Sequence, residues 1–370
     1  MPRRPLAHLK LPVEQSRGRR YPEPEHPYRN AFQRDRDRII HARAFRRLEN
    51  KTQVFPPGIS DHFRNRLTHT LEVAQVARTV AAALGLDEDL TEALALVHDI
   101  GHPPFGHAGE EELHRQMQRF GDSFDHNLHA LRIVDRLEQR YAPFPGLNLT
   151  FEVREGIVKH SRDLAPGQLP EFLPDLRPPL EAQLIDLADE IAYNTADLDD
   201  ADSAGLFEHA ALFAAVPAAA ALWQQAESQY PAAPPRVLFH EMLRALINRL
   251  VSGLIDGTTQ AAAGARDVED LRRQPQRCAV LTAGTAAINA ALKRFLHERV
   301  YESEELVAER GASTGHVAEL FAYYLARPGE LPENTRETLS EEPLHRVVCD
   351  YIAGMTDRYF HRVYFGTLPS

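Results

Sequence analysis

The chain is poor in cysteine and in long apolar runs. Cys278 and Cys349 are the only cysteines among its 370 residues, which excludes a disulfide framework or a thiolate metal cage. No run of about 18 or more apolar residues occurs, so no membrane-spanning helix is expected. The basic N-terminus is not followed by an apolar segment, which argues against a secretory signal. These absences favour a cytoplasmic protein without a membrane partner.

A surplus of positive charge and a P-loop are also missing. The chain has 42 basic and 53 acidic residues and a formal charge of −11, which argues against a chain-wide surface for nucleic acid. A polyanionic small substrate stays compatible with this charge, because arginines and a metal ion can reverse the potential inside a cleft. No G-x-x-x-x-G-K-[ST] sequence occurs, so phosphate binding by a P-loop is not expected.

Helical spacing of apolar residues dominates the chain, and strand-like alternation is scarce. We therefore predict an all-α protein. Helices are expected at 67–84, 90–100, 127–141, 151–160, 180–198, 235–254 and 279–295. Gly85 stands where a helix C-terminus favours glycine. Five prolines make 161–179 a loop, and 210–235 is expected to form a surface helix followed by a linker.

Composition divides the chain into three parts. Residues 1–27 are rich in Pro, Arg and Glu and lack apolar periodicity, so we expect a flexible arm or disordered leader, which contact with another subunit could order. Residues 28–205 are expected to form the catalytic core. Residues 206–370 are expected to be a helical region packed on that core.

Histidine is abundant and clustered. Ten of the 18 histidines lie between His41 and His160, and histidine is a common metal ligand and acid–base group. The densest segment runs from His98 to Glu110 and reads HDIGHPPFGHAGE. An adjacent His–Asp pair at a helix end can direct a nitrogen and an oxygen at one cation. An isolated His-Asp dipeptide is more often a polar cluster at a helix end. Here three further ionisable residues follow in a stiff Gly/Pro loop, which favours a functional site.

With its flanking sequence, this segment resembles the HD-domain superfamily of metal-dependent phosphohydrolases. Within that superfamily it is most similar to the bacterial deoxynucleoside triphosphate (dNTP) triphosphohydrolase, or dGTPase-like, branch. The pattern His…His-Asp…Asp is matched by His69, by the pair His98-Asp99 and by Asp189. The blocks FRRLENKTQVF at 45–55 and VCDYIAGMTDR at 348–358 extend the match. The resemblance implies an HD-domain helical fold with additional C-terminal helices.

The resemblance assigns a metal ion to four residues, namely His69, His98, Asp99 and Asp189. Taken singly, His69 on an apolar helix and Asp189 on a helix surface are more typical of structural residues. Together they form a mixed nitrogen and oxygen set, which leaves positions of an octahedral ion open for water and phosphate. The implied cofactor is a divalent cation, with Mn²⁺ favoured and Mg²⁺, Co²⁺, Fe²⁺ or Ni²⁺ as alternatives.

Catalytic roles are implied for His107, Glu110 and His126. His107 and Glu110 are three residues apart, so one helical turn can bring them together. A carboxylate raises the basicity of an adjacent imidazole, which suits a general acid or base. By resemblance, His126 lies close to the reacting phosphorus, although Asp125 and Asn127 beside it are also ordinary helix-capping residues.

Substrate contacts are implied for Gln53, Arg66, His102, Lys159, Tyr193 and Asp197. Arg66 falls on the helix face of His69, from which a guanidinium can reach a phosphate. Tyr193 and Asp197 follow Asp189 at steps of four, a spacing that any helix face can show. By resemblance this stripe meets the deoxyribose with help from Gln53, while His102 and Lys159 approach the phosphates.

The implied reaction is attack of water on the α-phosphorus of a dNTP, which releases deoxynucleoside and tripolyphosphate. The implied partners are the dNTP substrate, further copies in a homo-oligomer, and a dNTP or single-stranded DNA effector. Two other hypotheses stay open. One is an HD phosphohydrolase for another nucleotide, such as a 5′-nucleotidase or a signalling-nucleotide hydrolase, against which the Tyr193–Asp197 stripe argues. The other is a module that senses dNTPs or single-stranded nucleic acid without catalysis, against which the His107–Glu110 pair argues.

Overall fold

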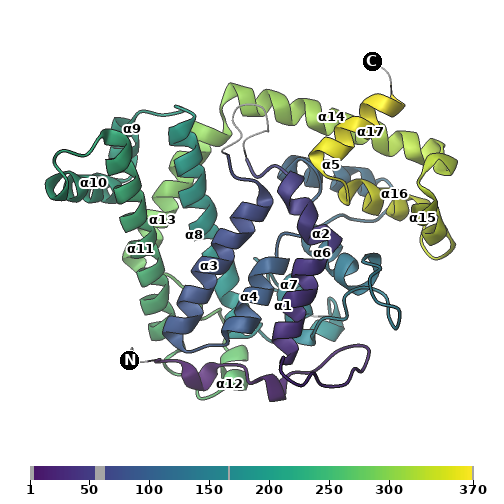
Figure 1. The fold of residues 1–370 in the computed structure, drawn as a ribbon, viewed down its shortest axis with the longest axis horizontal. Helices are drawn as coiled ribbons and strands as arrows, with labels where there is room; N and C mark the ends of the chain where they lie inside the picture. The colour runs from purple at the N-terminus through teal and green to yellow at the C-terminus, as the bar shows by residue number, and fades with distance from the viewer. Residues whose placement is uncertain (1–3, 55–62, 166, 369–370) are drawn as a thin grey trace.

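The computed structural model describes residues 4–54, 63–165 and 167–368. Within these residues the protein consists of α-helices joined by loops and short 3-10 or π turns, and strand-type pairing is limited to isolated bridges. Figure 1 shows this arrangement. The prediction of an all-α protein is confirmed. None of the described helices is both long enough and apolar enough to span a membrane.

The helices alternate with short connections along the whole described chain. They are α1 (Ala31–His41), α2 (Arg43–Arg47), α3 (Arg66–Leu84), α4 (Glu88–Val97), α5 (Gly106–Gln118), α6 (His126–Arg132), α7 (Phe151–Val158), α8 (Leu180–Ser203), α9 (His209–Ala215), α10 (Pro217–Gln229), α11 (Pro235–Ala262), α12 (Val268–Arg272), α13 (Ala283–Leu296), α14 (Glu304–Ala326), α15 (Glu333–Arg336), α16 (Leu344–Ala353) and α17 (Asp357–Thr367). The helix predicted at 127–141 is shorter than expected, because α6 passes into a π turn, Ile133–Leu137, and then ends. The surface helix and linker predicted at 210–235 are two helices, α9 and α10, and a turn.

The boundaries of α3 and α4 follow from local chemistry. Asn65 and Thr68 form a capping box at the start of α3, in which each side chain accepts the backbone N–H of the other residue. Gly85 ends α3 with φ of 89°, which is the left-handed conformation that glycine tolerates best. Asp87 caps α4 by accepting the Leu90 N–H at 2.9 Å. The helices that carry His69 and lead to His98 are therefore fixed at their ends by the sequence.

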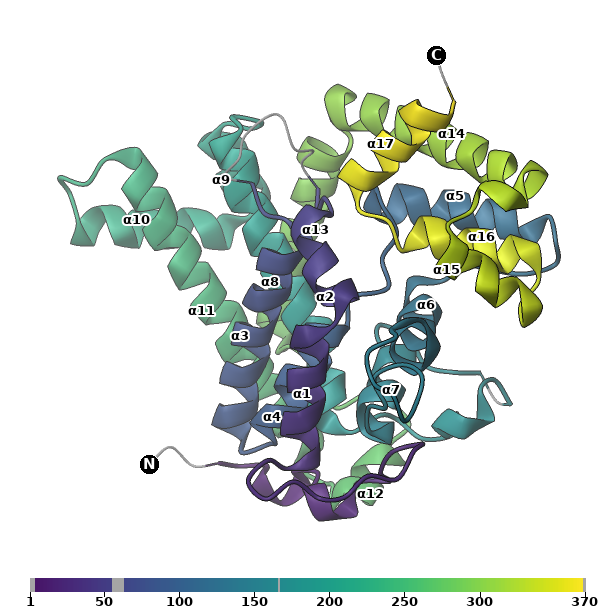
Figure 2. The same ribbon diagram turned by 45° about the vertical axis from the view of Figure 1, so that its right-hand side comes forward.

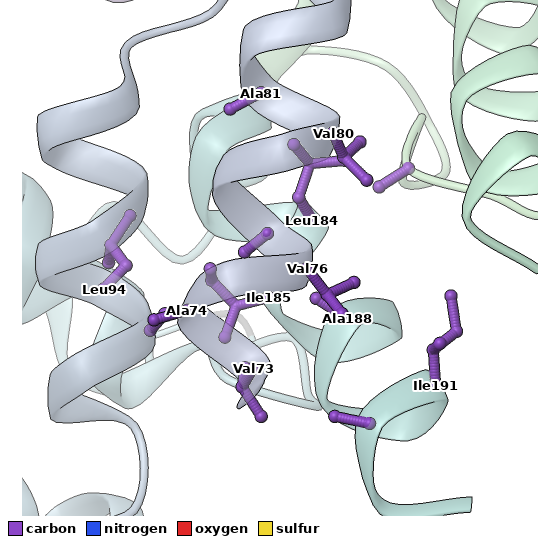
Figure 3. Close-up of a cluster of buried hydrophobic side chains, with 14 of the residues drawn as sticks. Val73, Ala74, Val76, Val80, Ala81, Leu94, Leu184, Ile185, Ala188 and Ile191 are labelled. Atoms are coloured by element: carbon purple, nitrogen blue, oxygen red, sulfur yellow. The ribbon is translucent and has the colours of Figure 1, made fainter. Parts of the chain in front are cut away.

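The main hydrophobic core is centred on α3, α4 and α8, each of which contacts the other two. Figure 3 shows part of it, with Val76 and Val80 of α3 close to Leu184 of α8. Burying each such side chain contributes about 1.5–3 kcal/mol. The same core takes in apolar side chains from Leu6 to Val300, so the chain on both sides of residue 205 shares one interior.

A second hydrophobic core lies among the C-terminal helices. Leu113 and Met117 of α5 are buried there together with Phe321 of α14, Ile352 of α16 and Phe360 of α17. Figure 2 shows α5 lying beside α14, α16 and α17. A helix from the first third of the chain is thus enclosed by helices from its end.

The N-terminal segment lies on the main core, where we had expected a flexible arm. Within residues 4–27, Leu6, Leu9 and Leu11 are buried, and the Leu11 N–H donates to Glu181 on α8. The Arg19 guanidinium donates to the carboxylate of Asp35. The expectation of flexibility is corrected for these residues. Isolated leucines among prolines and arginines carry no helical period, and their burial depends on a surface built by distant helices.

Glu181, which anchors this segment, makes folding depend on pH. Burial raises the pKa of Glu181 from 4.5 to about 7. The folded chain then holds a proton that the unfolded chain has lost, so this group lowers the free energy of unfolding as pH rises from about 4.5 to about 7. Its Oε1 accepts both Leu11 N–H and Asp87 N–H, and its buried Oε2 has no hydrogen-bond partner in the described part of the chain.

Replacing Glu181 with glutamine should remove this pH dependence. The amide oxygen of Glu181→Gln can accept both N–H groups without carrying a charge. At pH 8 we expect the variant to have a higher Tm than wild type and a free energy of unfolding that is larger by up to about 3 kcal/mol. Both differences should shrink as the pH falls towards 5. Thermal unfolding across this pH range measures it. A variant that loses stability equally at pH 5 and pH 8 would show that the Glu181 carboxyl is not the source of this pH dependence.

Candidate active site

Four side chains on the main core converge to form a candidate site for one metal ion. These residues, His69, His98, Asp99 and Asp189, are called the metal cluster below. His69 lies on α3, Asp189 on α8, and the other two directly after α4. His69 Nε2 is 2.9 Å from Asp189 Oδ1, and His98 Nε2 is 3.7 Å from the same oxygen and 3.8 Å from Asp99 Oδ1. The structure therefore brings together the four residues that the sequence predicts as ligands.

The donors of the metal cluster suit a divalent cation. His98 Nδ1 donates to the Ala95 carbonyl at 2.6 Å, which makes Nε2 the ring nitrogen that can bind a metal ion in place of a proton. That buried Nε2 has no hydrogen-bond partner in the described residues. Burial lowers the pKa of His98, but the carboxylates of Asp99 and Asp189 outweigh it and raise the pKa to about 9. Positive charge is thus favoured at this nitrogen, and a mixed nitrogen and oxygen set of this kind binds divalent metals.

Asp99 is held from both sides. Arg66 Nη1 donates to Asp99 Oδ2 at 2.9 Å, and His102 Nδ1 lies 2.8 Å from Asp99 Oδ1. Burial raises the pKa of Asp99, but Arg66 and the imidazoles of His102 and His98 outweigh it and hold the pKa well below its usual range. Arg66, predicted as a phosphate contact, therefore also fixes the carboxylate that faces the metal position.

A second group, Glu110 with His126 and His107, lies beside His102. Glu110 Oε1 is 2.8 Å from His126 Nδ1 and accepts the His126 N–H at 2.9 Å. His107 Nδ1 is farther away, 3.5 Å from Glu110 Oε2, and its side chain is 80% exposed. Burial raises the pKa of Glu110, but the imidazoles of His107 and His126 outweigh this effect and hold the pKa well below its usual range. Glu110 therefore holds His126 more closely than the His107 that its spacing suggested.

Close backbone approach brings His126 to this place. The rings of His102 and His126 stack with centroids 4.0 Å apart. A Cβ atom on Gly101 would lie 2.0 Å from the His126 carbonyl oxygen. Only glycine at position 101 leaves room for the start of α6 to pack against the loop that follows His98 and Asp99.

The stripe along α8 leads from the metal cluster to a tyrosine that the sequence did not indicate. Asp197 is buried and accepts the hydroxyl of Tyr301 at 2.5 Å, and burial raises the pKa of Asp197 to about 7. Lys293 Nζ lies 5.9 Å from the Tyr193 ring centroid. Tyr301 and Lys293 belong to no motif, and each is about a hundred positions from its partner along the chain. Only the fold therefore reveals these contacts. Gln53 keeps its amide oxygen buried without a hydrogen-bond partner in the described residues.

The Lys159 ammonium is bound by protein acceptors. It donates to Glu155 Oε1 at 2.7 Å and to the carbonyls of Leu173 and Leu176. These three acceptors leave no N–H of the ammonium for the phosphate contact that the sequence predicted. A glutamate four residues earlier on α7 is an ordinary helical partner for a lysine, and this spacing could have indicated the buried pair.

His160, the next residue, lies beside the metal cluster instead. Its Nδ1 is 2.8 Å from Asp186 Oδ1, and its Nε2 is 3.9 Å from Asp189 Oδ2. The His98 and His160 ring centroids are 5.3 Å apart. Its position at the end of α7, inside the histidine-rich part of the chain, was the available signal in the sequence.

Comparison with known proteins identifies the family. Residues 66–194 match the HD domain, and residues 279–365 match the phosphohydrolase-associated domain. The chain is 45% identical to a deoxyguanosinetriphosphate triphosphohydrolase-like protein of Brucella ovis, over 96% of this chain and 94% of that protein. It is 44% identical to a protein of the same description from Geobacter sulfurreducens, over 93% and 90%.

The chain belongs to the deoxyguanosinetriphosphate triphosphohydrolase-like family. This confirms the resemblance to HD-domain phosphohydrolases, a family of hydrolases. In this member of the family, the HD match contains the metal cluster and the group around Glu110, while the match to the phosphohydrolase-associated domain contains Lys293, Tyr301 and most of α17. The candidate site thus draws on both matched regions.

Metal content tests the metal cluster. Asp189→Asn removes a carboxylate that lies close to both His69 and His98, so we expect affinity for Mn²⁺ to fall by at least about 100-fold. Titration calorimetry and metal analysis after dialysis measure this. Asp202→Asn is the matched control, because Asp202 lies on the same helix and pairs with His209 Nε2 at 2.7 Å. Equal metal content in the two variants would contradict the ligand assignment.

Proposed function

We propose that the protein is a metal-dependent dNTP triphosphohydrolase, which adds water to the α-phosphorus of a dNTP and releases deoxynucleoside and tripolyphosphate. The observation that supports this most strongly is that His102 contacts both the metal cluster and the His126 that Glu110 holds. Asp99 of the metal cluster contacts His102 at 2.8 Å, and the His102 ring stacks on His126, which Glu110 holds. A metal position and a carboxylate-supported imidazole are therefore neighbours, as hydrolysis of a phosphate ester needs.

His69, His98, Asp99 and Asp189 would hold the metal. When bound, a divalent ion supplies polarisation of a phosphate oxygen and a lowered pKa for a coordinated water. The mixed nitrogen and oxygen ligands favour Mn²⁺, with Mg²⁺, Co²⁺, Fe²⁺ or Ni²⁺ as alternatives. Arg66 fixes Asp99, and with His102 it contributes positive or hydrogen-bonding groups towards the phosphates.

The proton steps are assigned to His126, His107 and Glu110. Because His126 Nδ1 faces Glu110 Oε1 at 2.8 Å, the carboxylate fixes the tautomer in which Nδ1 carries hydrogen and Nε2 is free to accept or return a proton. His107 is the exposed member of the group, so an incoming substrate can reach it. One imidazole would assist the attacking water, and the other would protonate the leaving 5′-oxygen.

The sugar is assigned to the stripe on α8. The 3′-hydroxyl of a deoxyribose can donate to the buried Asp197, beside Tyr301, and the unpartnered oxygen of Gln53 can accept a further hydrogen bond. The Tyr193 ring would pack where a ribose 2′-hydroxyl projects, which disfavours ribonucleotides. The name of the relatives, deoxyguanosinetriphosphate triphosphohydrolase-like protein, is compatible with a deoxynucleoside triphosphate substrate.

Product analysis tests this function directly. With Mn²⁺ and each dNTP, we expect deoxynucleoside and tripolyphosphate in equal amounts, without release of orthophosphate. Because one added hydroxyl must be excluded by packing, ribonucleotides should show a kcat/KM lower by roughly 10- to 100-fold. Separation of the products by chromatography measures both. Orthophosphate as the first product, or turnover confined to nucleoside monophosphates, would contradict the proposal.

Substitutions in the Glu110 group test the proton steps. His126→Ala and Glu110→Gln should each lower kcat by about 100-fold or more while the bound metal is retained, because neither residue belongs to the metal cluster. His114→Ala is the control on α5, since His114 contacts the Phe124 carbonyl through Nδ1 and the Gln118 side chain through Nε2, and both partners lie outside the metal cluster and the Glu110 group. A kcat for His126→Ala close to that of His114→Ala would remove His126 from the mechanism.

A further inference from the structure

The proposed active site is divided between the two hydrophobic cores. The metal cluster is carried by α3, α4 and α8, whose apolar residues belong to the main core. His107 and Glu110 are carried by α5, whose Leu113 and Met117 are buried in the second core. The placement of the catalytic group against the metal cluster therefore depends on how the second core is attached to the first.

A buried aspartate lies at that attachment. Asp357, the first residue of α17, is 5% exposed. Its Oδ2 accepts the Thr52 N–H at 2.7 Å, and its Oδ1 accepts the Phe105 N–H at 3.1 Å. The first bond reaches the segment that precedes α3, and the second reaches the residue that precedes α5. One carboxylate thus ties α17 to both parts of the active site.

A buried lysine makes a second connection between the same segments. Lys51 is 3% exposed, and its ammonium donates to the carbonyl of His102 and, at 3.2 Å, to the carbonyl of Ala353. Burial lowers the pKa of Lys51 to about 7, although the negative charge of Asp357 opposes this effect. Burying a charge is unfavourable unless it is compensated. Here the hydrogen-bond partners of both side chains are backbone groups: the N–H groups of Thr52 and Phe105 for Asp357, and the carbonyls of His102 and Ala353 for Lys51.

The loop between these contacts holds a residue in an uncommon conformation. Phe105 has φ of 64°, in the left-handed region that residues with side chains rarely adopt. Its ring packs against Phe360 and His361 of α17, with centroids 5.0 and 5.2 Å away. Gly106, where α5 begins, follows directly. The direction in which α5 leaves the loop is therefore set by contacts with α17.

We infer that Asp357 and Lys51 are positioning residues, which hold the 102–105 loop between the two cores and so place His107 and Glu110 against the metal cluster. The inference rests on the proposed function for the roles of His107 and Glu110. It assigns a role to the FRRLENKTQVF and VCDYIAGMTDR blocks, because Lys51 belongs to the first and Asp357 to the second. Neither residue touches the reacting atoms in this arrangement.

Asp357→Asn is the decisive substitution. It keeps the size of the side chain, but its amide group cannot accept an N–H, so one of the two backbone contacts is lost. We expect kcat for dNTP hydrolysis to fall by about 100-fold, the cost of a displacement of roughly 1 Å at a reacting group. The KM and the metal content should stay close to wild type. Lys51→Met should also lower kcat and leave the KM and the metal content unchanged. If Asp357→Asn does not fold, Lys51→Met takes its place in the test.

The matched control is Glu152→Gln. Glu152 is also a buried carboxylate that accepts a backbone N–H from a distant segment, that of Arg17 at 2.7 Å, but it lies outside the loop. Both variants should lose thermal stability, and only Asp357→Asn should lose kcat. If Asp357→Asn lowers Tm while its kcat matches that of Glu152→Gln, Asp357 is structural only and the inference is overturned.

A measurement independent of activity separates this inference from the proposed function. Hydrogen exchange followed by mass spectrometry should show faster exchange over residues 105–118 in Asp357→Asn than in Glu152→Gln, with Mn²⁺ binding unchanged. If the wild-type protein hydrolyses no dNTP, the proposed function fails, and exchange over this segment still decides whether Asp357 holds α5. Unchanged exchange in that segment would overturn the inference.

Discussion

Two carboxylates that face one buried imidazole nitrogen are the constraint on which the rest of the site depends. Asp99 and Asp189 approach His98 Nε2 at 3.8 and 3.7 Å, and the other ring nitrogen, Nδ1, is occupied by its hydrogen bond to the Ala95 carbonyl. Such a concentration of negative charge in a protein interior is stable only beside positive charge. Arg66 supplies part of it through Asp99, and a divalent cation would supply the remainder.

The packing of three helices makes this arrangement available. Because α3, α4 and α8 contact one another through small and branched apolar residues, their backbones come close enough for His69, His98 and Asp189 to meet. A close-packed interior also resists adjustment, so the spacing of the donors is fixed by the core rather than by the ligand. The Glu110 group has a different support, since α5 is buried among the C-terminal helices.

Part of the site follows from sequence pattern alone. The His98-Asp99 pair, the following glycines and the step-of-four stripe on α8 are local features, and helical geometry converts such spacing into position. The partners of these residues do not follow in the same way. Glu110 is three residues from His107, yet it lies closer to His126, because the glycine at 101 lets α6 approach. Lys159 looked available for phosphate, but folding encloses it with Glu155 and two carbonyls.

The sequence by itself determined the all-α class and the ends of α3, and it predicted the four residues of the metal cluster. Each of these depends on neighbours along the chain or on a recognisable family pattern. Tertiary structure alone decided that Tyr301 meets Asp197, that residues 4–27 lie on the core, and that Asp357 reaches Phe105 from 252 positions away. Contacts of this kind depend on which surfaces the helices bury against one another, and that choice is made by the whole hydrophobic interior at once.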